Sequence, residues 1–487
     1  MDVQSLVAAT QDYSKLDSDA VALVLPADRA AWQLPAALRK AVDEAVQQGD
    51  LALKAGRTLY LHRPAGLKTA RLVVAIATDG AVKAWRKAVD AALAALKAGG
   101  AARVALVWGG SSAVTAAMAE AAACAAADAV YVYRLTKPSA PEPSRLSRVE
   151  LVCDAAVQAE VDAGLARGRA IAAGVELARE VANRPGNHCT PTLLAEQAVA
   201  LGKQQAGLKV EVLERKDIDK LGMGAFLAVA QGSEEPPRFI VLKYQGAGKK
   251  DAPVVLVGKG ITFDTGGISI KPAAEMDEMK FDMGGAASVL GTFRAVAELK
   301  PKINLIGLIP TCENMPDGRA IKPGDVVTSM SGQTIEILNT DAEGRLILCD
   351  ALTYAERFKP AAVVDIATLT GACIIALGHQ HAGLFSPDDV LADALLAAGR
   401  TALDTAWRMP LDEEYDDALK SNFADIPNVG PRVGGAITAA KFLQRFTAKY
   451  RWAHLDVAGV AFRSGTAKGG TGRPVPLLTH FVLGQVR

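Results

Sequence analysis

The chain is organised around the stretch Asn339-Thr340-Asp341-Ala342-Glu343-Gly344-Arg345-Leu346, which places two carboxylates and a guanidinium at alternate positions. The apolar-rich residues 335–338 before it predict a strand, and residues 347–353 after it predict a helix. We therefore expect Asp341 and Glu343 on a strand-to-helix turn, where loop side chains can converge on a site. Taken alone, the stretch fits equally well a surface turn with acidic residues at a helix N-terminus.

A second charged cluster lies upstream, where an apolar run at 254–257 ends in a glycine-rich segment. This segment carries Lys259, Asp264 and Lys271, and Asp282 follows beside two further glycines. Glycines allow a backbone to approach a ligand closely, so a phosphate cradle is one alternative. The glycine spacing, however, fits neither the dinucleotide-binding pattern G-x-G-x-x-G nor the P-loop pattern.

Together the two clusters supply three Asp, one Glu, two Lys and one Arg on loops at strand ends. Any one of these residues alone would be read as a solvated lysine, a helix cap or half of an ion pair. Carboxylate oxygens in this number suit divalent cations, and a carboxylate shared by two ions is a common way to build a paired metal site. The joint spacing therefore favours a metal site over separate structural roles.

The unbroken N-T-D-A-E-G-R-L motif and the spacing of all seven residues resemble the leucyl aminopeptidases, the M17 family of dinuclear metallopeptidases, of the bacterial aminopeptidase A type. The resemblance covers residues 170–487 by motif and residues 1–155 by layout. It implies an aminopeptidase that releases N-terminal residues, leucine and similar ones preferred, from peptides with a free N-terminus. It also implies a cytoplasmic homohexamer whose active sites face an interior cavity.

The resemblance further implies that two divalent metal ions are held by Lys259, Asp264, Asp282, Asp341 and Glu343. Asp264 and Glu343 would bridge the ions, Lys259 and Asp282 would complete one shell, and Asp341 the other. A mixed oxygen and nitrogen shell accepts Mn or Zn, and also Mg or Co. A lysine ligand must be neutral, and two nearby cations lower its pKa enough to allow that.

The same resemblance assigns roles in the reaction to the remaining residues. Lys271 would stabilise the tetrahedral oxyanion, and Arg345 would hold a bicarbonate ion that relays the proton. The paired ions would bind the substrate amine and carbonyl and activate a water molecule. The substrate-binding positions are Lys271, Met279, Asn339, Thr368, Leu369 and Gly371. Without the resemblance, Met279 would be read as a core residue, and the loop at 368–371 could either shape a substrate pocket or merely turn the chain.

Length and composition bound the rest of the prediction. A chain of 487 residues favours two domains, and a net charge of +1 gives no strong field toward nucleic acid or a membrane surface. The six cysteines are scattered, which predicts reduced core thiols and a cytosolic protein. The N-terminus lacks a signal-peptide pattern, and no uninterrupted apolar run reaches membrane-spanning length.

Alternating strand and helix patterns predict an α/β fold with two α/β domains. Residues 1–155 form a smaller non-catalytic domain with a mostly parallel sheet, and residues 156–487 a larger catalytic domain with a central mixed sheet flanked by helices. A Pro-rich segment at 137–144 predicts a loop, and a long helix at 156–182 bridges the halves. Strands are expected at 21–25, 58–61, 72–77, 104–108, 149–152, 210–213, 239–242, 254–257, 305–309 and 362–366. Other helices are expected at 38–48, 81–97, 113–127, 285–299 and 346–358.

The sequence argues against several other classes of protein. H-E-x-x-H and G-x-S-x-G are absent, which argues against a zincin and an α/β-hydrolase. A two-metal phosphoesterase fits the carboxylates but not the lysine ligand. A DNA-binding regulatory or architectural role, known in the bacterial branch, has only a slight basic excess in residues 1–160 in its favour. His188 beside Cys189 predicts a structural turn, and His454 a hydrogen-bonded core histidine.

Overall fold

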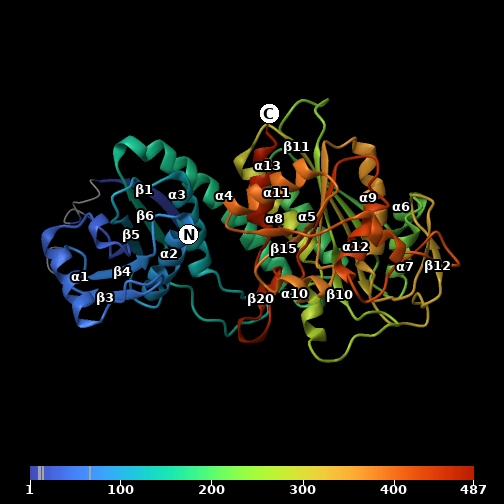
Figure 1. Cartoon of the computed structure of the whole chain (residues 1–487), viewed down its shortest axis with the longest axis horizontal. Coiled ribbons are helices and arrows are strands. Elements are labelled where there is room, and N and C mark those ends of the chain that lie inside the picture. The colour runs from blue at the N-terminus through green and yellow to red at the C-terminus, as the bar shows by residue number, and fades with distance from the viewer. Residues whose placement is uncertain (9–12, 14–15, 65–66, 487) are drawn as a thin grey trace. The chain divides into compact units, whose positions relative to one another are not determined.

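In a computed structural model of the chain, which describes residues 1–8, 13, 16–64 and 67–486, two compact units are resolved (Figure 1). They comprise Met1–Ala172 and Ala173–Arg487, and helix α4 (Gln158–Asn183) passes from the first to the second. A long helix between the halves is thus confirmed. The division into functional domains at residue 155 stays a prediction, since the compact units meet within that helix.

Six strands of the described part of the N-terminal unit form one sheet in the order β1-β6-β5-β2-β4-β3, with only β3 antiparallel to its neighbour. The strands are β1 (Asp2–Val7), β2 (Ala20–Pro26), β3 (Thr58–His62), β4 (Arg71–Ala77), β5 (Arg103–Trp108) and β6 (Arg148–Cys153). Helices α2 (Val82–Lys97) and α3 (Ala116–Val130) pack on one face, and α1 (Ala36–Gln48) on the other. The predicted α/β layer with a mostly parallel sheet is confirmed.

Two of the differences between this unit and the sequence prediction have a clear physical reason. Strand β1 was not predicted, because its sequence is mixed and as an edge strand it buries only Val3 fully. Helix α3 begins three residues later than expected, because the Thr115 hydroxyl accepts the N–H of Met118 and caps the helix there.

The C-terminal unit is built on a mixed sheet in the order β16-β15-β18-β14-β9-β11-β8-β7, with β10 also pairing with β11. Its strands are β7 (Leu208–Glu214), β8 (Arg238–Gln245), β9 (Val254–Gly258), β10 (Gly260–Asp264), β11 (Asn304–Asn314), β14 (Ala362–Ala367), β15 (Ala382–Phe385), β16 (Ala406–Arg408) and β18 (Trp452–Asp456). The central strands β18, β14, β9 and β11 are parallel to one another. Strand β8 is antiparallel to both β11 and β7, and β15 is antiparallel to β18 but parallel to β16. The predicted central mixed sheet is confirmed.

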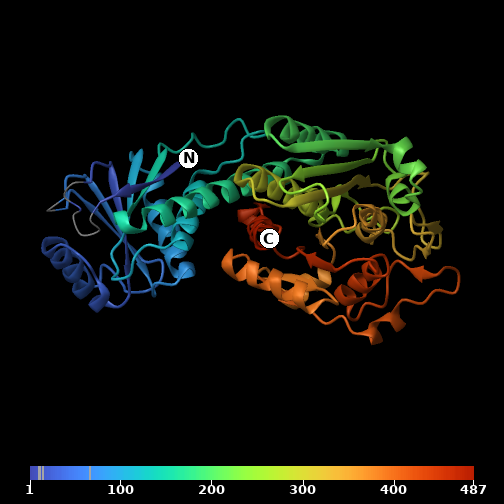
Figure 2. The same ribbon diagram turned by 90° about the horizontal axis from the view of Figure 1, so that it is seen from above.

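Helices cover both faces of this sheet. One apolar core lies under α5 (Pro191–Gln204), α8 (Gly284–Leu299), α11 (Asp389–Thr401) and α13 (Val475–Gly484), and the other under α7 (Gly224–Ala230), α9 (Gly344–Ala355) and α12 (Gly435–Gln444). Figure 1 shows α8, α11 and α13 on one side of the strands and α9 and α12 on the other, and Figure 2 shows α13 between α8 and α11. The site elements are therefore held from both sides.

Smaller elements complete the unit. They are α6 (Arg215–Lys220), α10 (Gly371–Leu377), the 3-10 helix η5 (Met276–Phe281), a sheet of β12 (Val326–Thr328), β13 (Thr334–Glu336) and β17 (Ile426–Pro427), and the pair β19 (Phe462–Arg463) and β20 (Gly469–Gly470). The strand predicted at 335–338 is wrong in its extent and ends at Glu336. It ends there because the N–H of Ile337 bonds to Asp325 in a loop, and that of Leu338 to the Asn428 side chain.

The start of α8 is pressed against the ends of two strands. A β-carbon at Gly285 would lie 2.0 Å from the Ile366 carbonyl oxygen of β14 and 2.7 Å from the Lys259 nitrogen that follows β9. No other residue could replace glycine here without moving the helix. This packing brings Asp282, two residues before the helix, beside Lys259.

The remaining structural predictions concern thiols and membranes. All six cysteines are free thiols, and five of them are buried, which confirms reduced core thiols. Residues 186–188 form a 3-10 turn that ends at buried Cys189, as expected for a structural role. Among the described helices, none is both long and apolar enough to cross a bilayer.

Candidate metal centre and active site

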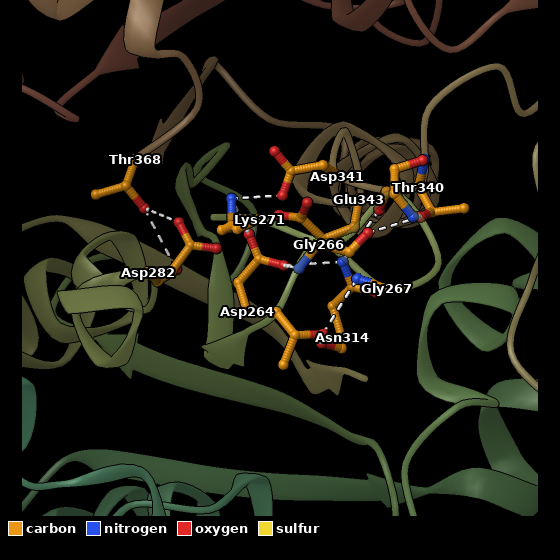
Figure 3. Close-up of polar contacts among 12 residues, drawn as sticks. Asp264, Gly266, Gly267, Lys271, Asp282, Asn314, Thr340, Asp341, Glu343 and Thr368 are labelled. Carbon is orange, nitrogen blue, oxygen red and sulfur yellow. Dashed lines mark hydrogen bonds and ion pairs between the residues drawn. The ribbon is translucent and has the colours of Figure 1, made fainter. Parts of the chain in front are cut away.

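Charged side chains meet at the carboxyl ends of the central strands (Figure 3). The cluster consists of Lys259, Asp264, Lys271, Asp282, Asp341 and Glu343, which we call the carboxylate–lysine cluster. Its members come from the end of β10 and the loops that flank it, from the end of η5 and from the turn before α9. Residues predicted from two distant stretches of sequence are thus brought together, at the edge of an open α/β sheet where ligands usually bind.

Lys259 is the more deeply buried of the two lysines in the cluster. Its Nζ lies 2.8 Å from Asp282 Oδ2 and 2.7 Å from Glu343 Oε1, and it donates to the Thr368 carbonyl oxygen at 3.2 Å. The side chain fits because position 344 is glycine: a β-carbon there would lie 2.6 Å from Nζ. The glycine of the N-T-D-A-E-G-R-L motif therefore makes room for a lysine 85 residues upstream.

Lys271 joins the other two carboxylates. Its Nζ lies 2.8 Å from Asp264 Oδ2 and also contacts Asp341 Oδ1. Asp341 is the most open of the four acids, with 32% of its side chain exposed, whereas 20% of the Lys271 side chain is exposed. Solvent and small ligands therefore reach the cluster from the side of Lys271 and Asp341.

Neutral polar groups orient the acids. Asp264 Oδ1 accepts the Gly266 N–H at 2.9 Å and an amide hydrogen of Asn314 at 2.8 Å, and Asp282 Oδ1 accepts the Thr368 hydroxyl at 2.6 Å (Figure 3). Asn314 also donates to the Thr340 carbonyl oxygen at 3.0 Å, so it links the two loops of the cluster. Sequence reasoning missed Asn314, although its position at the polar end of an apolar strand was a usable signal.

Burial and mutual repulsion set the protonation of the cluster. Burial, with the nearby Glu343 carboxylate, raises the pKa of Asp264, and burial also raises the pKa of Asp282. Burial lowers the pKa of Lys259, but the carboxylates of Asp282 and Glu343 outweigh it and raise that pKa overall. Without a metal ion the two lysines are thus charged and neutralise part of the acidic field.

The residues present fit divalent cations. Asp264, Asp341 and Glu343 each offer an oxygen within 4.8 Å of the others. Glu343 Oε2 is buried and, among the described residues, has neither a hydrogen-bond partner nor an ion pair. A buried carboxylate oxygen with free lone pairs is costly unless a ligand satisfies it. The three carboxylate oxygens of Asp264, Asp341 and Glu343 around one point are the kind of donor set that hard divalent ions prefer.

Arg345 stands in the first turn of α9, two residues after Glu343. Its Nη1 donates to the Asn428 carbonyl oxygen at 2.8 Å, while its buried Nε has no hydrogen-bond partner within the described part of the chain. Burial lowers the pKa of the guanidinium to about 10, which leaves it positively charged at neutral pH. Arg345 is thus a buried cation with a free donor.

The predicted substrate-binding residues occupy different positions around the cluster. Thr368 is buried and touches Asp282, and the next residue, Leu369, donates its N–H to Asp456 Oδ1 at 3.2 Å. Gly371 is exposed and begins α10. Met279 lies in η5, where its carbonyl oxygen accepts the Asp282 N–H.

Asn339 plays a local structural role in the structure. Its side-chain Oδ1 accepts the Asp341 N–H at 2.9 Å, which shapes the turn that carries Asp341. His454, predicted as a core histidine, is fully buried, with Nδ1 2.5 Å from Asp365 Oδ1, and that prediction is confirmed.

A buried carboxylate–lysine cluster at the strand ends of a mixed α/β sheet is typical of hydrolytic enzymes with a metal centre. The catalytic-domain model of the cytosol aminopeptidase family matches residues 176–479, and the model of its N-terminal domain matches residues 24–139. The chain therefore belongs to the cytosol aminopeptidase family, the M17 peptidases, and is a hydrolase. The resemblance indicated by N-T-D-A-E-G-R-L is confirmed.

Curated relatives agree with this assignment. A probable cytosol aminopeptidase of Methylibium petroleiphilum is 66% identical over 487 residues, the full length of both chains. Probable cytosol aminopeptidases of Polaromonas naphthalenivorans and an Acidovorax species are 60% and 61% identical over 444 residues. These matches cover 91% of this chain and 86% and 88% of the respective relatives.

Proposed function

We propose that the protein is a metal-dependent aminopeptidase that releases N-terminal residues, leucine and similar ones preferred, from peptides. Two divalent cations, Mn or Zn with Mg or Co as alternatives, would be held by Lys259, Asp264, Asp282, Asp341 and Glu343. The observation that carries the proposal is the convergence of Asp264, Asp341 and Glu343 on one point, with the buried Glu343 Oε2 left without a partner among the described residues. Family membership supplies the reaction, and this geometry supplies the reason for metal dependence.

The lysine ligand fits the same proposal. Lys259 already lies within 2.8 Å of two acids, so the removal of its proton would leave an amine lone pair among carboxylate oxygens. A neighbouring divalent ion favours that neutral form by charge repulsion. Four carboxylates would balance two divalent cations, which would leave Lys271 and Arg345 as the positive charges of the site.

Lys271 and Arg345 would each have a separate role in the reaction. When bound, the cations would supply Lewis acidity toward the scissile carbonyl and a lowered pKa for the attacking water. Lys271, at the open side, would stabilise the negative charge on the tetrahedral carbonyl oxygen. Arg345 cannot act as a base, but its free Nε donor suits a small planar anion such as bicarbonate, which would carry the proton.

The surroundings of the cluster suggest how a substrate would lie. Met279, Asn339, Thr368, Leu369 and Gly371 stand on segments that adjoin the four acids, and we assign them, with Lys271, to substrate binding. A free amine at the metal centre would restrict cleavage to the first peptide bond, which makes the enzyme an exopeptidase.

Assembly and location follow from the family resemblance rather than from the single chain. We infer a homohexamer in the cytoplasm. Sedimentation of the purified chain tests the assembly, since a hexamer has six times the mass of the monomer.

Hydrolysis of leucine p-nitroanilide tests the function. The chelated protein should be inactive and should regain activity with Mn²⁺ or Zn²⁺, whereas Glu343→Ala should stay inactive with either metal. Full activity after exhaustive chelation would refute metal dependence, and inactivity of the intact protein with every metal would refute the enzyme assignment. A role in nucleic-acid binding remains the alternative, and a gel shift with duplex DNA at low salt discriminates: no shift removes it.

A further inference from the structure

Asn428 is a fully buried polar residue that directly follows β17. Its side-chain Oδ1 accepts the backbone N–H groups of Leu338 at 2.8 Å and Asn339 at 3.3 Å. Its Nδ2 donates to the carbonyl oxygens of Asn339 at 2.7 Å and Ala342 at 3.4 Å. One amide group therefore holds both ends of the turn that carries Asp341.

The backbone of Asn428 is held as firmly as its side chain. Its N–H donates to the Glu336 carbonyl oxygen at 2.8 Å, which ties it to β13. Its carbonyl oxygen accepts Nη1 of Arg345 at 2.8 Å. The same residue thus connects the strand before the turn, the turn itself and the guanidinium after it.

These bonds replace secondary structure where the chain has none. Residues 338–342 lie between β13 and α9, and their peptide groups need partners because buried N–H and C=O groups are costly when unpaired. A primary amide both donates and accepts, so it can serve N–H and C=O groups of one turn at once. An aspartate would lose both donors, and an aliphatic residue would satisfy neither group.

We propose that Asn428 is the positioning residue that fixes the Asp341–Glu343 turn and the Arg345 guanidinium, and thereby sets the affinity of the centre for divalent cations. The inference rests on the proposed function, since it assumes that this turn binds metal. Groups that orient metal ligands typically change metal affinity or activity by about 10- to 100-fold when removed.

A purely structural amide offers the matched control. Asn304 makes the same kind of clamp at the opposite end of β11 from Asn314: its Oδ1 accepts the Ala247 N–H at 3.1 Å, and its Nδ2 donates to the carbonyl oxygens of Gly248 at 2.7 Å and Asp251 at 3.0 Å. It is nearly as buried, at 9% exposure. Asn304→Ala should therefore lower stability without touching the metal centre.

The experiment compares Asn428→Ala with Asn304→Ala in the full-length protein. Mn²⁺ is titrated calorimetrically into the metal-free chains, and kcat and KM for leucine p-nitroanilide are measured at saturating Mn²⁺. We expect Asn428→Ala to weaken Mn²⁺ binding by about tenfold or more. It should also lower kcat at saturating Mn²⁺, because the backbone carbonyl of residue 428, which binds Arg345, is no longer held in place by the side-chain bonds to the turn. Asn304→Ala should lower the melting temperature comparably, with Mn²⁺ affinity unchanged.

The outcomes are separable. Equal Mn²⁺ affinities and kcat values in the two variants would overturn the inference and leave the proposed function intact. Failure of the unaltered chain to bind Mn²⁺ would instead refute the proposed function itself. If Asn428→Ala does not fold, Asn428→Ser replaces it, since a serine hydroxyl can still make one bond to the turn. Unchanged Mn²⁺ affinity in Asn428→Ser would count against the inference.

Discussion

Gly344 lies directly against the amine of Lys259, so that a β-carbon at position 344 would stand 2.6 Å from Nζ and 2.6 Å from Cε. Gly344→Ala should therefore displace Lys259 from Asp282 and Glu343 and weaken Mn²⁺ binding by about tenfold or more. The metal-free protein should also become less stable, because displacement of Lys259 leaves two buried carboxylates without their cationic neighbour. The gain of about 1 kcal/mol from alanine over glycine in a helix offsets only part of that loss. Calorimetric titration and thermal melts of the metal-free protein measure the two effects.

A glycine at the start of another helix provides the control for that substitution. Gly435 begins α12, and among the described residues a β-carbon there would meet only Ala372, at an ordinary 3.5 Å. Gly435→Ala should bind Mn²⁺ like the unaltered protein. Equal Mn²⁺ affinity in both variants would show that Lys259 does not need the space at position 344.

Removal of the Lys271 charge should separate catalysis from metal binding. Lys271→Ala should lower kcat by about 100-fold, the usual effect of losing a group that stabilises an oxyanion. Mn²⁺ binding should not weaken, because the lost ammonium competes with cations for Asp264 and Asp341. Steady-state kinetics at saturating Mn²⁺ and a metal titration test this, with Lys243→Ala, which removes a surface ion pair to Glu211, as control. Weaker Mn²⁺ binding with normal kcat would contradict the assigned role.

Asn314 should matter for the metal centre through Asp264. Asn314→Ala removes the amide hydrogens that bond to Asp264 Oδ1 and to the Thr340 carbonyl oxygen. Loss of these buried bonds should weaken Mn²⁺ binding by about 10- to 100-fold and lower the unfolding free energy by about 1–3 kcal/mol. Metal titration and urea unfolding measure both quantities. A stability loss with unchanged Mn²⁺ affinity would restrict Asn314 to a structural role.

Asp456 should influence substrate binding and leave the metal ions unaffected. Its carboxylate accepts the Thr370 hydroxyl at 2.7 Å and the N–H groups of Leu369 at 3.2 Å and Ala458 at 3.1 Å, which fixes the loop after β14. Asp456→Asn exchanges an acceptor for a donor in this loop, and kcat/KM for leucine p-nitroanilide should fall about tenfold. Thr370→Ser keeps the hydroxyl and should behave normally. A loss of Mn²⁺ affinity in Asp456→Asn would contradict this division of roles.

Asp350 should make stability depend on pH. Burial raises its pKa to about 7, although the N–H groups of Met330 and Phe226, which bond to it at 2.8 and 2.9 Å, oppose the shift. Between about pH 4 and pH 7 the unfolded chain has lost this proton while the folded protein retains it, so its contribution to the unfolding free energy decreases as pH rises.

Urea unfolding of Asp350→Asn at pH 4.5, 6.0 and 7.5 measures that contribution. The stability of the variant relative to the unaltered protein should rise with pH by a few kcal/mol, on the order set by the pKa shift. Asp388→Asn is the control, because Arg451 lowers the pKa of Asp388 to about 2, below the range tested. A difference that is flat across pH 4.5–7.5 for Asp350→Asn would refute the raised pKa.

The sequence was informative where chemistry and local pattern coincide. Lys259 directly follows strand β9, Asp264 is the last residue of strand β10, and Asp282 precedes the glycine-rich start of α8, so the local pattern indicated each of them. Buried strands such as β9 and β14 were predictable because both faces are covered and the sequence is mostly a continuous apolar run, interrupted in β14 by Asp365 alone. Edge strand β1 gave no such signal, since most of its side chains are exposed or only half-buried and its sequence is therefore mixed.

The supporting residues were harder to find for a different reason. Asn428 follows a two-residue strand in a loop and contacts a turn almost 90 residues earlier, so no periodicity or spacing marks it. Asp456 was not predicted as a supporting residue, because its bonds to Leu369 and Thr370 depend on how β18 aligns with β14. Such contacts depend on tertiary structure, which the local sequence does not encode.

The two lysines of the carboxylate–lysine cluster allow the chain to fold before it binds metal. Lys259 and Lys271 each span two acids, so every carboxylate of the cluster has a cationic neighbour before any ion arrives. A newly made chain can therefore fold in a cell that is short of divalent metal and persist as a folded, metal-free protein. Under the proposed function, metal binding would be an exchange in which the incoming ion displaces a proton from Lys259. The supply of metal would then govern when the chain becomes active without governing whether it folds.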